Sequence, residues 1–474
     1  MIRVLRFADV NHPSRGTYSI KWHPVGVMSR RVWPSVAVVS LVGLLVGTFF
    51  AVHGQLASSP WRAAFITAAL WAGFAVGAFS VMRSPLRLGV ALILAGGIGL
   101  QVVAMSATPQ MSDDFYRYIW DGKVQDAGIS PYRYAPIDPA LASIRDEYLF
   151  PPGKTCPEKG VEGACPLINR PTVHTIYPPV AEAYFFGMFE LTPTSWGARS
   201  VQLGAALGAI ATTIVLLMVT ARRGVDPRRA VLWAWCPLVV MELGNNAHVD
   251  GLASLFVVAA LGVISAKTLS RRGALLSGVL VGLAIATKLI PAIVMPSMVK
   301  RRPIAVVLAA LAAVIAVYLP HVLTLGSATA GFLPGYLNEE KDGAFTVIKF
   351  LGLAAFAEPI ALLILFGTAL WAMFRTDPLA PWRTAAVVVG MTFLVTTPTY
   401  EWYALLLVPL VALGARASWL VLPLAMTFVY MSVGFPDVHQ YLRPVAFIVA
   451  GASVAATALY ARRTQPSRDR TVSV

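Results

Sequence analysis

The chain has 474 residues, of which 57% are hydrophobic and only 13% are charged. A soluble protein of this size needs far more charge to cover its surface, so the composition excludes one. The net charge of +15 does not indicate nucleic-acid binding, because the basic residues gather in short loops between apolar runs, as the positive-inside rule predicts. Apolar runs recur from Val36 to Tyr460 without strict alternation, which predicts an all-α polytopic membrane protein rather than a β-barrel.

The first part of the chain is predicted to enter the membrane from the cytoplasm. Residues 1–33 are basic and lack the short apolar segment and cleavage site of a signal peptide, so we expect a cytoplasmic tail. Residues 34–106 hold three apolar spans, near 34–52, 61–82 and 88–106. Basic residues precede the first span and follow the second, so the positive-inside rule places residue 107 outside the cytoplasm.

Residues 107–195 form the longest polar segment, since the next apolar run begins only near Trp196. We expect an extracytoplasmic loop domain that packs on the membrane surface. Cys156 and Cys165 lie within it, where the environment is oxidising, so we predict a disulfide between them. Free thiols are the alternative, and a zinc site is disfavoured because the sequence has no C-x-x-C pair or histidine close to these cysteines.

The second part of the chain, residues 196–460, is predicted to hold the remaining transmembrane helices with short outer loops, and residues 461–474 a cytoplasmic tail. The total expected is about 12–14 transmembrane helices. The run Gly273–Met298 has basic residues at both ends, so both ends should be cytoplasmic. We therefore expect two short or broken helices that go out and return, with Lys288 near the outer side.

This topology brings ionisable groups from distant parts of the chain to one side of the membrane. They occur in the first polar segment, in the turns between later spans and in the broken run around residue 288. Their convergence on the outer face predicts a functional site there. The groups are Asp113, Asp114, His248, Asp250, Lys288, Glu401 and Asp437.

The stretch Ser112–Tyr134 is the first candidate for chemistry. If it is helical, four polar residues share one face at i, i+3, i+4 and i+7. They are Asp114, Arg117, Tyr118 and Asp121. The pair Asp113 and Asp114 could be a general base, a metal ligand set, or a hydrated helix cap where the chain leaves the membrane. Its aromatic surroundings are typical of a sugar-binding pocket, although an interfacial aromatic belt would have the same composition.

The other candidates come from later turns. Glu242 lies within or at the end of an apolar span, and an intramembrane carboxylate indicates function unless it only forms hydrogen bonds between helices. Lys288 suits a phosphate group, with snorkelling to the interface as the alternative. Around these two residues we expect further substrate-binding groups from three stretches, the turn after Glu242, the loop 169–179 and the stretch 399–403. The residues concerned are Asn245, His248 and Asp250, then His174 and Tyr177, then Tyr400 and Glu401.

The residues that resemble a known superfamily are DDFYRYIWDG, then G-I-S-P-Y, TIYPP, N-x-x-H-x-D-G, A-T-K-x-x-P and TPTYEWY. They resemble the GT-C glycosyltransferases, and more narrowly the actinobacterial polyprenyl-phosphomannose-dependent mannosyltransferases of family 87 and their α-1,6-mannosyltransferase relatives. The resemblance extends from about Met111 to about Pro409. It implies an enzyme that works on the outer face of the plasma membrane and uses a polyprenyl-phosphate sugar donor. It also implies that an acidic residue of the first outer loop acts as the base. That role would fall to Asp114, with Asp113 as the alternative.

The resemblance further implies inverting transfer of a sugar, in our prediction mannose, to a cell-envelope glycan or glycolipid. No cofactor is then required, although in some branches a divalent ion such as Mg²⁺ or Mn²⁺ assists at the acidic motif, where Asp113 and Asp114 would hold it. We expect a monomer in the bacterial plasma membrane. The alternative is a flippase or transporter for a lipid-linked sugar. It is disfavoured because the sequence shows no internal repeat and no cluster of ionisable groups at the membrane midplane.

Overall fold

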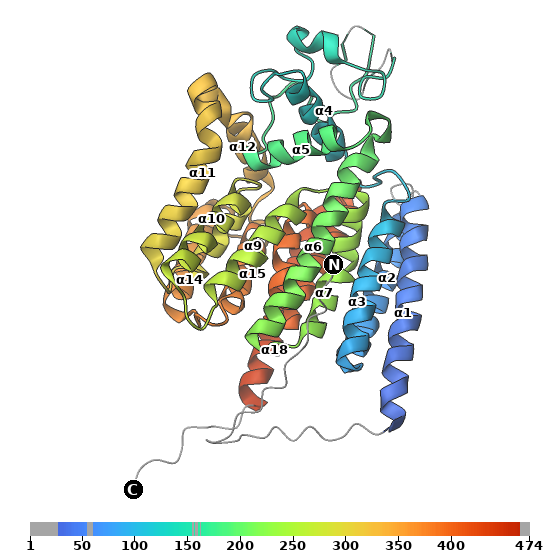
Figure 1. Cartoon of the computed structure of the whole chain (residues 1–474), viewed down its shortest axis with the longest axis vertical. Helices are drawn as coiled ribbons and strands as arrows, with labels where there is room; N and C mark the ends of the chain where they lie inside the picture. The colour runs from blue at the N-terminus through green and yellow to red at the C-terminus, as the bar shows by residue number, and fades with distance from the viewer. Residues whose placement is uncertain (1–26, 55–59, 154–155, 157–159, 162, 465–474) are drawn as a thin grey trace, which may run out of the picture.

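The computed structural model describes residues 27–54, 60–153, 156, 160–161 and 163–464 (Figure 1). Of the two predicted cytoplasmic tails, residues 1–26 and 465–474 lie outside the described residues. All the regular elements of the described chain are helices, and the predicted all-α polytopic architecture is confirmed. Its longer bundle helices are α1 (Val27–His53), α2 (Pro60–Arg83), α3 (Leu86–Ala104), α6 (Ala198–Arg223), α9 (Asp250–Ile264), α10 (Arg271–Ile285), α11 (Pro303–Leu325), α14 (Ala357–Arg375), α15 (Trp382–Thr396), α17 (Val421–Met431) and α18 (Pro436–Thr464).

Seven helices of the described chain are long and apolar enough to cross a membrane. They span Val32–His53, Trp61–Arg83, Leu86–Ala104, Ala198–Arg223, Pro303–Glu340, Ala354–Arg375 and Pro436–Ala461. Large apolar side chains such as Leu323 (76% exposed) and Leu363 (73% exposed) point away from the protein, as lipid-facing residues do. Shorter apolar helices accompany these seven, so the expected total of about 12–14 is reached only if short and broken segments are counted.

Two of the expected spans are broken into short pieces. The apolar segment 230–244 is divided among η4 (Pro227–Ala230), α7 (Val231–Ala234), α8 (Pro237–Val239) and a π-helical turn, η5 (Val240–Asn245). Pro237 explains the first break, because proline has no N–H to donate and clashes with the preceding turn. The run 273–298 is likewise interrupted, since α10 ends at Ile285 and the 3₁₀-helix η6 (Ile290–Ser297) follows. Lys288 lies in the interruption, as expected.

Close helix packing fixes this broken region against α11. A Cβ placed on Gly278 would lie 2.4 Å from the carbonyl oxygen of Val306, and one on Gly282 would lie 2.6 Å from that of Ala310. The two glycines are four residues apart on α10, so they let the backbones of α10 and α11 touch, as small residues do in membrane helices. This contact positions the C-terminal end of α10, which leads directly to Lys288.

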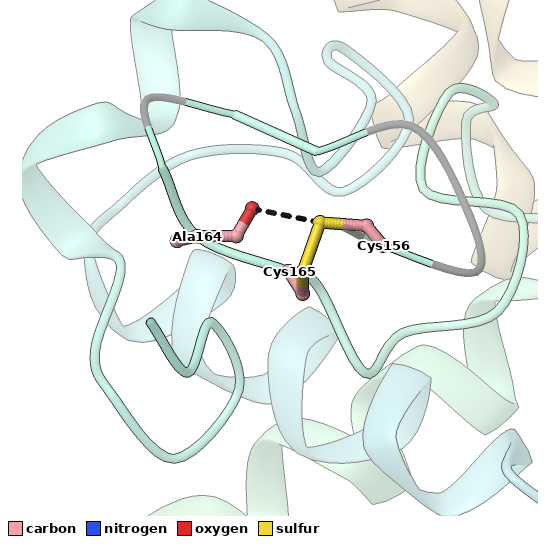
Figure 2. The surroundings of a disulfide bond; sticks show 3 residues. All are labelled: Cys156, Ala164 and Cys165. Atoms are coloured by element: carbon pink, nitrogen blue, oxygen red, sulfur yellow. Dashed lines mark hydrogen bonds between the residues drawn. A yellow bond between two sulfur atoms is a disulfide. The ribbon is translucent and has the colours of Figure 1, made fainter. Parts of the chain in front are cut away.

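The loop domain expected at 107–195 lies at one end of the bundle and is the teal and green region at the top of Figure 1. It contains α4 (Asp114–Asp126), α5 (Pro179–Leu191), η2 (Pro139–Ile144) and η3 (Thr194–Trp196). A disulfide joins Cys156 to Cys165, with an S–S distance of 2.07 Å (Figure 2). The Sγ of Cys156 also lies 3.6 Å from the carbonyl oxygen of Ala164, a contact without a hydrogen bond because a disulfide sulfur has no proton to donate.

Short helices complete the chain between the long ones. In the segment after α11 they are η7 (Gly326–Ala330), α12 (Leu333–Gly343), α13 (Thr346–Phe350) and η8 (Ala354–Phe356). After α15 they are η9 (Glu401–Leu406), α16 (Leu407–Ala412) and η10 (Ala417–Leu420). The first of these segments contacts the loop domain, since the backbone N–H of Phe332 donates to the carbonyl oxygen of Thr175 at 3.3 Å. The chain thus encloses a space between the loop domain and the bundle.

Candidate active site

A cavity of about 560 Å³ lies where the loop domain meets the bundle. We call it the Asp114 cavity. Its walls come from six stretches of the chain: the start of α4, the loop 169–177, the break before η6, the segment around α12, and the turns at 400–403 and 430–435. Its lining residues include Ser112, Asp113, Asp114, Arg117, Asn169, Arg170, His174, Tyr177, Lys288, Tyr336, Tyr400, Trp402, Tyr403 and Tyr430.

Asp114 is the most completely engaged acidic residue of the cavity. Asn169 donates from Nδ2 to its Oδ1 at 2.7 Å, and the hydroxyl of Tyr177 donates to its Oδ2 at 3.2 Å. The Nε2 of His248 lies 3.7 Å from the same Oδ2. The backbone N–H of Asp114 donates to the hydroxyl of Ser112 at 3.3 Å, at the first turn of α4. These contacts fix the carboxylate while 18% of its side chain stays exposed to the cavity.

The surroundings of Asp114 keep it ionised. Burial alone would raise its pKa, but His248, Lys288 and Asn169 together outweigh burial and bring the pKa below its ordinary value. Asp113 differs, since burial and the neighbouring charge of Asp114 raise its pKa. Its side chain is exposed, and no hydrogen bond or ion pair to it is found within the described part of the chain. The geometry therefore favours Asp114 over Asp113 as the positioned carboxylate.

His248 connects Asp114 to a second acid behind the cavity. Its Nδ1 lies 2.7 Å from Oε2 of Glu242, and its Nε2 also lies 3.2 Å from the hydroxyl of Ser112. The ring stacks on Trp402, with centroids 4.2 Å apart. Burial would lower the pKa of His248, but Glu242 and Asp114 outweigh burial and raise the pKa to about 9. A histidine held between two carboxylates is a cation at neutral pH, and it orients Asp114.

The π-helical turn η5 explains how these groups reach one another. Its backbone bonds run one residue further than in an α-helix, as between the N–H of Asn246 and the carbonyl of Met241 at 2.8 Å. Asn245 donates to the carbonyls of Ala104, Ala107 and Thr108, and its Oδ1 accepts from the N–H of Gln110. Both asparagines thereby hold the chain that leads into Ser112 and Asp114, since Asn246 accepts from the N–H of Met111 in the same way. Asn245 is buried and acts on the cavity only through this segment.

Lys288 brings a positive charge to the wall of the cavity. Its Nζ donates to Oδ2 of Asp250 at 3.1 Å, and it lies 5.3 Å from the ring centroid of Tyr177 and 6.0 Å from that of Tyr403. The side chain is 15% exposed, whereas that of Asp250 is 6% exposed. Lys288 therefore faces the cavity, and Asp250 holds it from behind. A cation against aromatic faces, fixed by one carboxylate, suits a phosphate oxygen.

The four polar residues considered above lie on the helix α4, which begins at Asp114, but they do not all face the cavity. Asp114 and Arg117 line the cavity, whereas Tyr118 and Asp121 are buried beneath it. Arg117 donates to the carbonyls of Asn169, Arg170 and Val173 and lies 3.9 Å from Asp121 as an ion pair. Arg117 thus shapes the loop that carries Asn169 and Tyr177.

Asp121 belongs to a buried cluster with Glu182 of α5. Thr175 donates to Oε1 of Glu182 at 2.7 Å, and Gln125 donates to its Oε2 at 3.1 Å. Burial raises the pKa of both carboxyl groups, and the charge of Asp121 raises that of Glu182 further, while Arg117 opposes both effects. The cluster lies under the loop 169–177, so it supports the cavity floor without contacting a ligand.

This cluster predicts a stability that decreases as pH rises. A carboxyl group with a raised folded-state pKa binds its proton more tightly in the folded than in the unfolded chain. The stabilisation is complete below the ordinary pKa near 4 and is lost as pH rises through the raised value. We expect Asp121→Asn to reduce the pH-dependent change in the free energy of unfolding by about 2 kcal/mol. Thermal unfolding of the purified protein between pH 5 and pH 8 measures it.

The matched control is Asp437→Asn, which changes an exposed carboxylate far from the cluster. It should leave the pH dependence of the unfolding temperature as in the unmodified protein. Equal slopes for Asp121→Asn and the unmodified protein would contradict a titrating pair at this position.

The remaining predicted residues fall into two groups. His174, Tyr177 and Tyr400 line the cavity. Glu242, Asn245, His248, Asp250 and Glu401 are buried behind it. Glu242 and Glu401 line a smaller space of about 40 Å³, which is large enough for a water molecule. The structure therefore brings the predicted residues to one region, with seven of them at the cavity wall and the others in support.

Several cavity residues were not among the candidates. Asn169 and Arg170 stand in a loop whose position depends on Arg117, and Arg170 forms a 2.7 Å ion pair with Glu339 of α12 across the cavity edge. Trp402 stacks between His248 and Tyr400. Trp402 follows Glu401 directly. The aromatic composition of the stretch 399–403 could therefore have identified Trp402 as a cavity residue. The loop residues carried no comparable sequence signal.

The donor set around Asp114 does not fit a divalent cation. Both carboxylate oxygens accept hydrogen bonds, and the cations His248 and Lys288 lower the pKa of Asp114. Groups of three or more His, Cys, Asp or Glu side chains arranged for a metal are absent from the described residues. A dication at Asp114 would have to displace two donors and approach two positive charges.

Comparison with known proteins gives one family match and one similar solved structure. Residues 175–398, a little less than half of the chain, match the model described as Glycosyltransferase family 87. No curated protein matches the chain. Among solved structures the chain is similar to ArnT from Cupriavidus metallidurans bound to undecaprenyl phosphate, at 13% identity and a TM-score of 0.43, over 80% of this chain and 81% of that one. The segment that carries Tyr177, His248 and Lys288 is thus similar to glycosyltransferase family 87.

Proposed function

We propose that the protein is an integral-membrane glycosyltransferase that moves a sugar from a polyprenyl-phosphate donor to a hydroxyl group of an acceptor glycan or glycolipid. The observation that carries the proposal is the pairing of a positioned carboxylate, Asp114, with a cation, Lys288, on walls of one cavity. A carboxylate can activate the acceptor hydroxyl, and a cation can stabilise the departing phosphate. The match of residues 175–398 to a glycosyltransferase family supports the same reaction class.

The reaction then proceeds by direct displacement. The acceptor hydroxyl gives its proton to Asp114 while its oxygen forms a bond to the anomeric carbon of the donor. The bond between that carbon and the phosphate oxygen breaks, and its electron pair leaves with the polyprenyl phosphate. Lys288 stabilises the negative charge of this leaving group. Attack from the face opposite the phosphate inverts the configuration at the anomeric carbon.

The low pKa of Asp114 has a consequence for this mechanism. A carboxylate with a depressed pKa is fully ionised at neutral pH but accepts a proton weakly. Proton transfer should therefore accompany formation of the new bond rather than precede it. The retained negative charge also stabilises the positive charge that develops at the anomeric carbon. His248 keeps the carboxylate in place during this change.

The sugar, the acceptor and the membrane side belong to the same proposal. Mannose and a cell-envelope acceptor follow from the family resemblance of the motifs, and the positive-inside rule favours the outer face of a bacterial plasma membrane for the cavity. Aromatic rings around the cavity, including Tyr336, Tyr400 and Tyr403, offer faces on which a sugar ring can stack. We propose that the protein works as a monomer, because one chain supplies the carboxylate and the cation.

The test is transfer by the purified protein. Polyprenyl-phosphate mannose with a labelled sugar should yield labelled product and polyprenyl phosphate when an envelope glycolipid acceptor is added. Glycans from cells without the gene should be truncated by mass spectrometry. Movement of the intact donor across a proteoliposome membrane, with no change in its covalent structure, would favour a flippase instead.

The donor set at Asp114 also predicts that the reaction does not depend on a metal ion. We expect the initial rate to stay unchanged in excess EDTA, because both oxygens of Asp114 already accept hydrogen bonds. The measurement compares rates with and without EDTA, followed by addition of Mg²⁺ or Mn²⁺. A loss of activity that either ion restores would contradict this expectation.

A further inference from the structure

A second cavity of about 750 Å³ lies on the bundle, and nothing in the proposed reaction uses it. We call it the α15 groove. The helix α15 supplies the largest share of its lining, and α14 and α18 supply the rest together with the turn before η10. Its lining residues are Trp371, Arg383, Thr384, Val387, Met391, Leu394, Gly414, Ala415, Arg416, Trp419, Gly451, Val454, Ala455 and Ala458.

Most of the α15 groove is apolar. Small residues of α18 keep it open, since Gly451 has no side chain and a Cβ there would lie 3.3 Å from Cδ2 of Leu394. Further along the same helix, Ala455 and Ala458 also line the groove and present only a methyl group. Trp371 of α14 is 42% exposed beside it. A groove of this composition between membrane helices accommodates a hydrocarbon chain.

Two arginines mark one end of the groove. Arg383 stands at the start of α15, and Arg416 stands in the turn before η10. Both side chains are exposed, and neither has an ion pair or a side-chain hydrogen bond among the described residues. The end of the groove therefore carries two positive charges without a carboxylate partner.

A third arginine adds to this positive charge. Arg229 donates to the carbonyls of Val411 and Ala415. Its guanidinium is therefore fixed against the residue that precedes Arg416. Burial lowers the pKa of Arg229, Arg383 lowers it further, and Asp226 opposes them. Asp226 forms its own ion pair with Arg228. The positive charges of Arg229 and Arg383 therefore repel each other, and an anion bound at this end of the groove would reduce that repulsion.

The charged end lies far from the Asp114 cavity. The helix α15 has 15 residues and therefore a rise of about 22 Å. At its other end, the carbonyl oxygen of Thr397 accepts from Nε of Arg443 at 2.8 Å, and Tyr400 three residues later lines the Asp114 cavity. An anion bound at Arg383 cannot contact Lys288 or Asp114. The α15 groove is thus a separate site.

We propose that the α15 groove binds an anionic phospholipid, with its phosphate between Arg383 and Arg416 and one acyl chain along α15. An arginine pair at the end of an apolar groove matches an anionic headgroup attached to a hydrocarbon chain. A zwitterionic lipid fits less well, because its own ammonium group would add to the uncompensated positive charge. Binding would hold α14, α15 and α18 together from the membrane side, away from the reaction.

The test uses Trp371 as a local reporter. The purified full-length protein is reconstituted in phosphatidylcholine nanodiscs that contain either dibrominated phosphatidylglycerol or dibrominated phosphatidylcholine at 10 mole per cent, where bromine quenches tryptophan within contact distance. We expect at least two-fold stronger quenching by the anionic lipid. Trp371→Phe should remove most of this difference, because the only other tryptophan of the described residues that lines the groove, Trp419, is buried.

The charge requirement is tested by Arg383→Gln/Arg416→Gln, with Arg271→Gln/Arg272→Gln as the matched control. The control pair is exposed at the start of α10 and lines none of the cavities described. The groove pair should lose the anionic preference, and the control pair should keep it. Equal quenching by the two lipids in the unmodified protein, equal loss in both variants, or displacement by polyprenyl phosphate at lower concentration than by phosphatidylglycerol would overturn the assignment. Equal quenching and displacement by polyprenyl phosphate are both measured on the unmodified protein. Misfolding of a variant therefore cannot obscure these two outcomes.

Discussion

Asp114→Asn is expected to lower kcat by about 10³-fold, within the range that a positioned general base contributes. The amide has almost the same shape as the carboxylate and can still accept a hydrogen bond from Asn169. It cannot take a proton from the acceptor hydroxyl, and it carries no charge to stabilise the anomeric carbon. The measurement is single-turnover transfer from a labelled polyprenyl-phosphate sugar by the purified variant.

The neighbouring substitution Asp113→Asn is the control for this result. Asp113 is exposed in the same turn and has no hydrogen bond or ion pair to its side chain within the described chain. Its replacement should change kcat less than about ten-fold, while unfolding temperatures of both variants stay close to that of the unmodified protein. The reverse order of effects would assign the base to Asp113. Full activity of both variants would remove this pair from the mechanism.

Lys288→Met is expected to lower kcat by about 10²–10³-fold, because the charge that develops on the leaving phosphate loses its partner. Methionine keeps the length of the apolar stem against Tyr177 and Tyr403. The substitution also leaves Asp250 as a buried carboxylate without its cation, which costs about 3–5 kcal/mol of stability. Transfer assays and thermal unfolding of the same preparation measure the two effects.

A double variant separates these two consequences. Lys288→Met/Asp250→Asn removes the unpaired carboxylate, so stability should return towards that of the unmodified protein while transfer stays slow. Recovery of transfer together with stability would show that Lys288 only supports the fold. The affinity for an acceptor analogue should be unaffected in either variant, because the proposed contact is with the donor phosphate.

The sequence allowed the cavity to be located because its charged groups are exceptions in an apolar chain. Asp114 and Lys288 lie where an unpaired charge next to the membrane would be costly. Each was therefore a candidate for a functional residue. The predicted order of membrane spans then assigned both residues to the same side of the membrane. The same reasoning predicted the interrupted helix around Lys288, since basic residues at both ends of one apolar run are incompatible with a single span.

The partners of Asp114 could not be predicted in the same way. Asn169 and Arg170 lie in a polar loop where asparagine and arginine are ordinary residues, and their position depends on Arg117 more than 50 residues earlier. His248 was identified as a candidate, but its stacking on Trp402 requires two turns that meet only after the bundle has packed. Contacts of this kind depend on long-range packing, which residue spacing does not encode.

The division of α4 is a further example. Periodicity placed Asp114, Arg117, Tyr118 and Asp121 on one face of a helix, and all four do lie on the helix α4. It gave no indication that α5 would cover the second half of that face and bring Glu182 to Asp121. A helical face is a property of one element, whereas exposure of that face is decided by whichever element packs on it.

The π-helical turn η5 makes the site sensitive to chain length. Each α-helical residue turns the chain by about 100°, so loss of one residue between Val240 and Asn245 would rotate Glu242 by that angle relative to His248. The same rotation would carry Asn245 away from the carbonyls at 104–108 that it now binds. A substitution here removes one contact, but a deletion changes the phase of the whole turn. Insertions and deletions should therefore be tolerated at this point far less than changes of side chain.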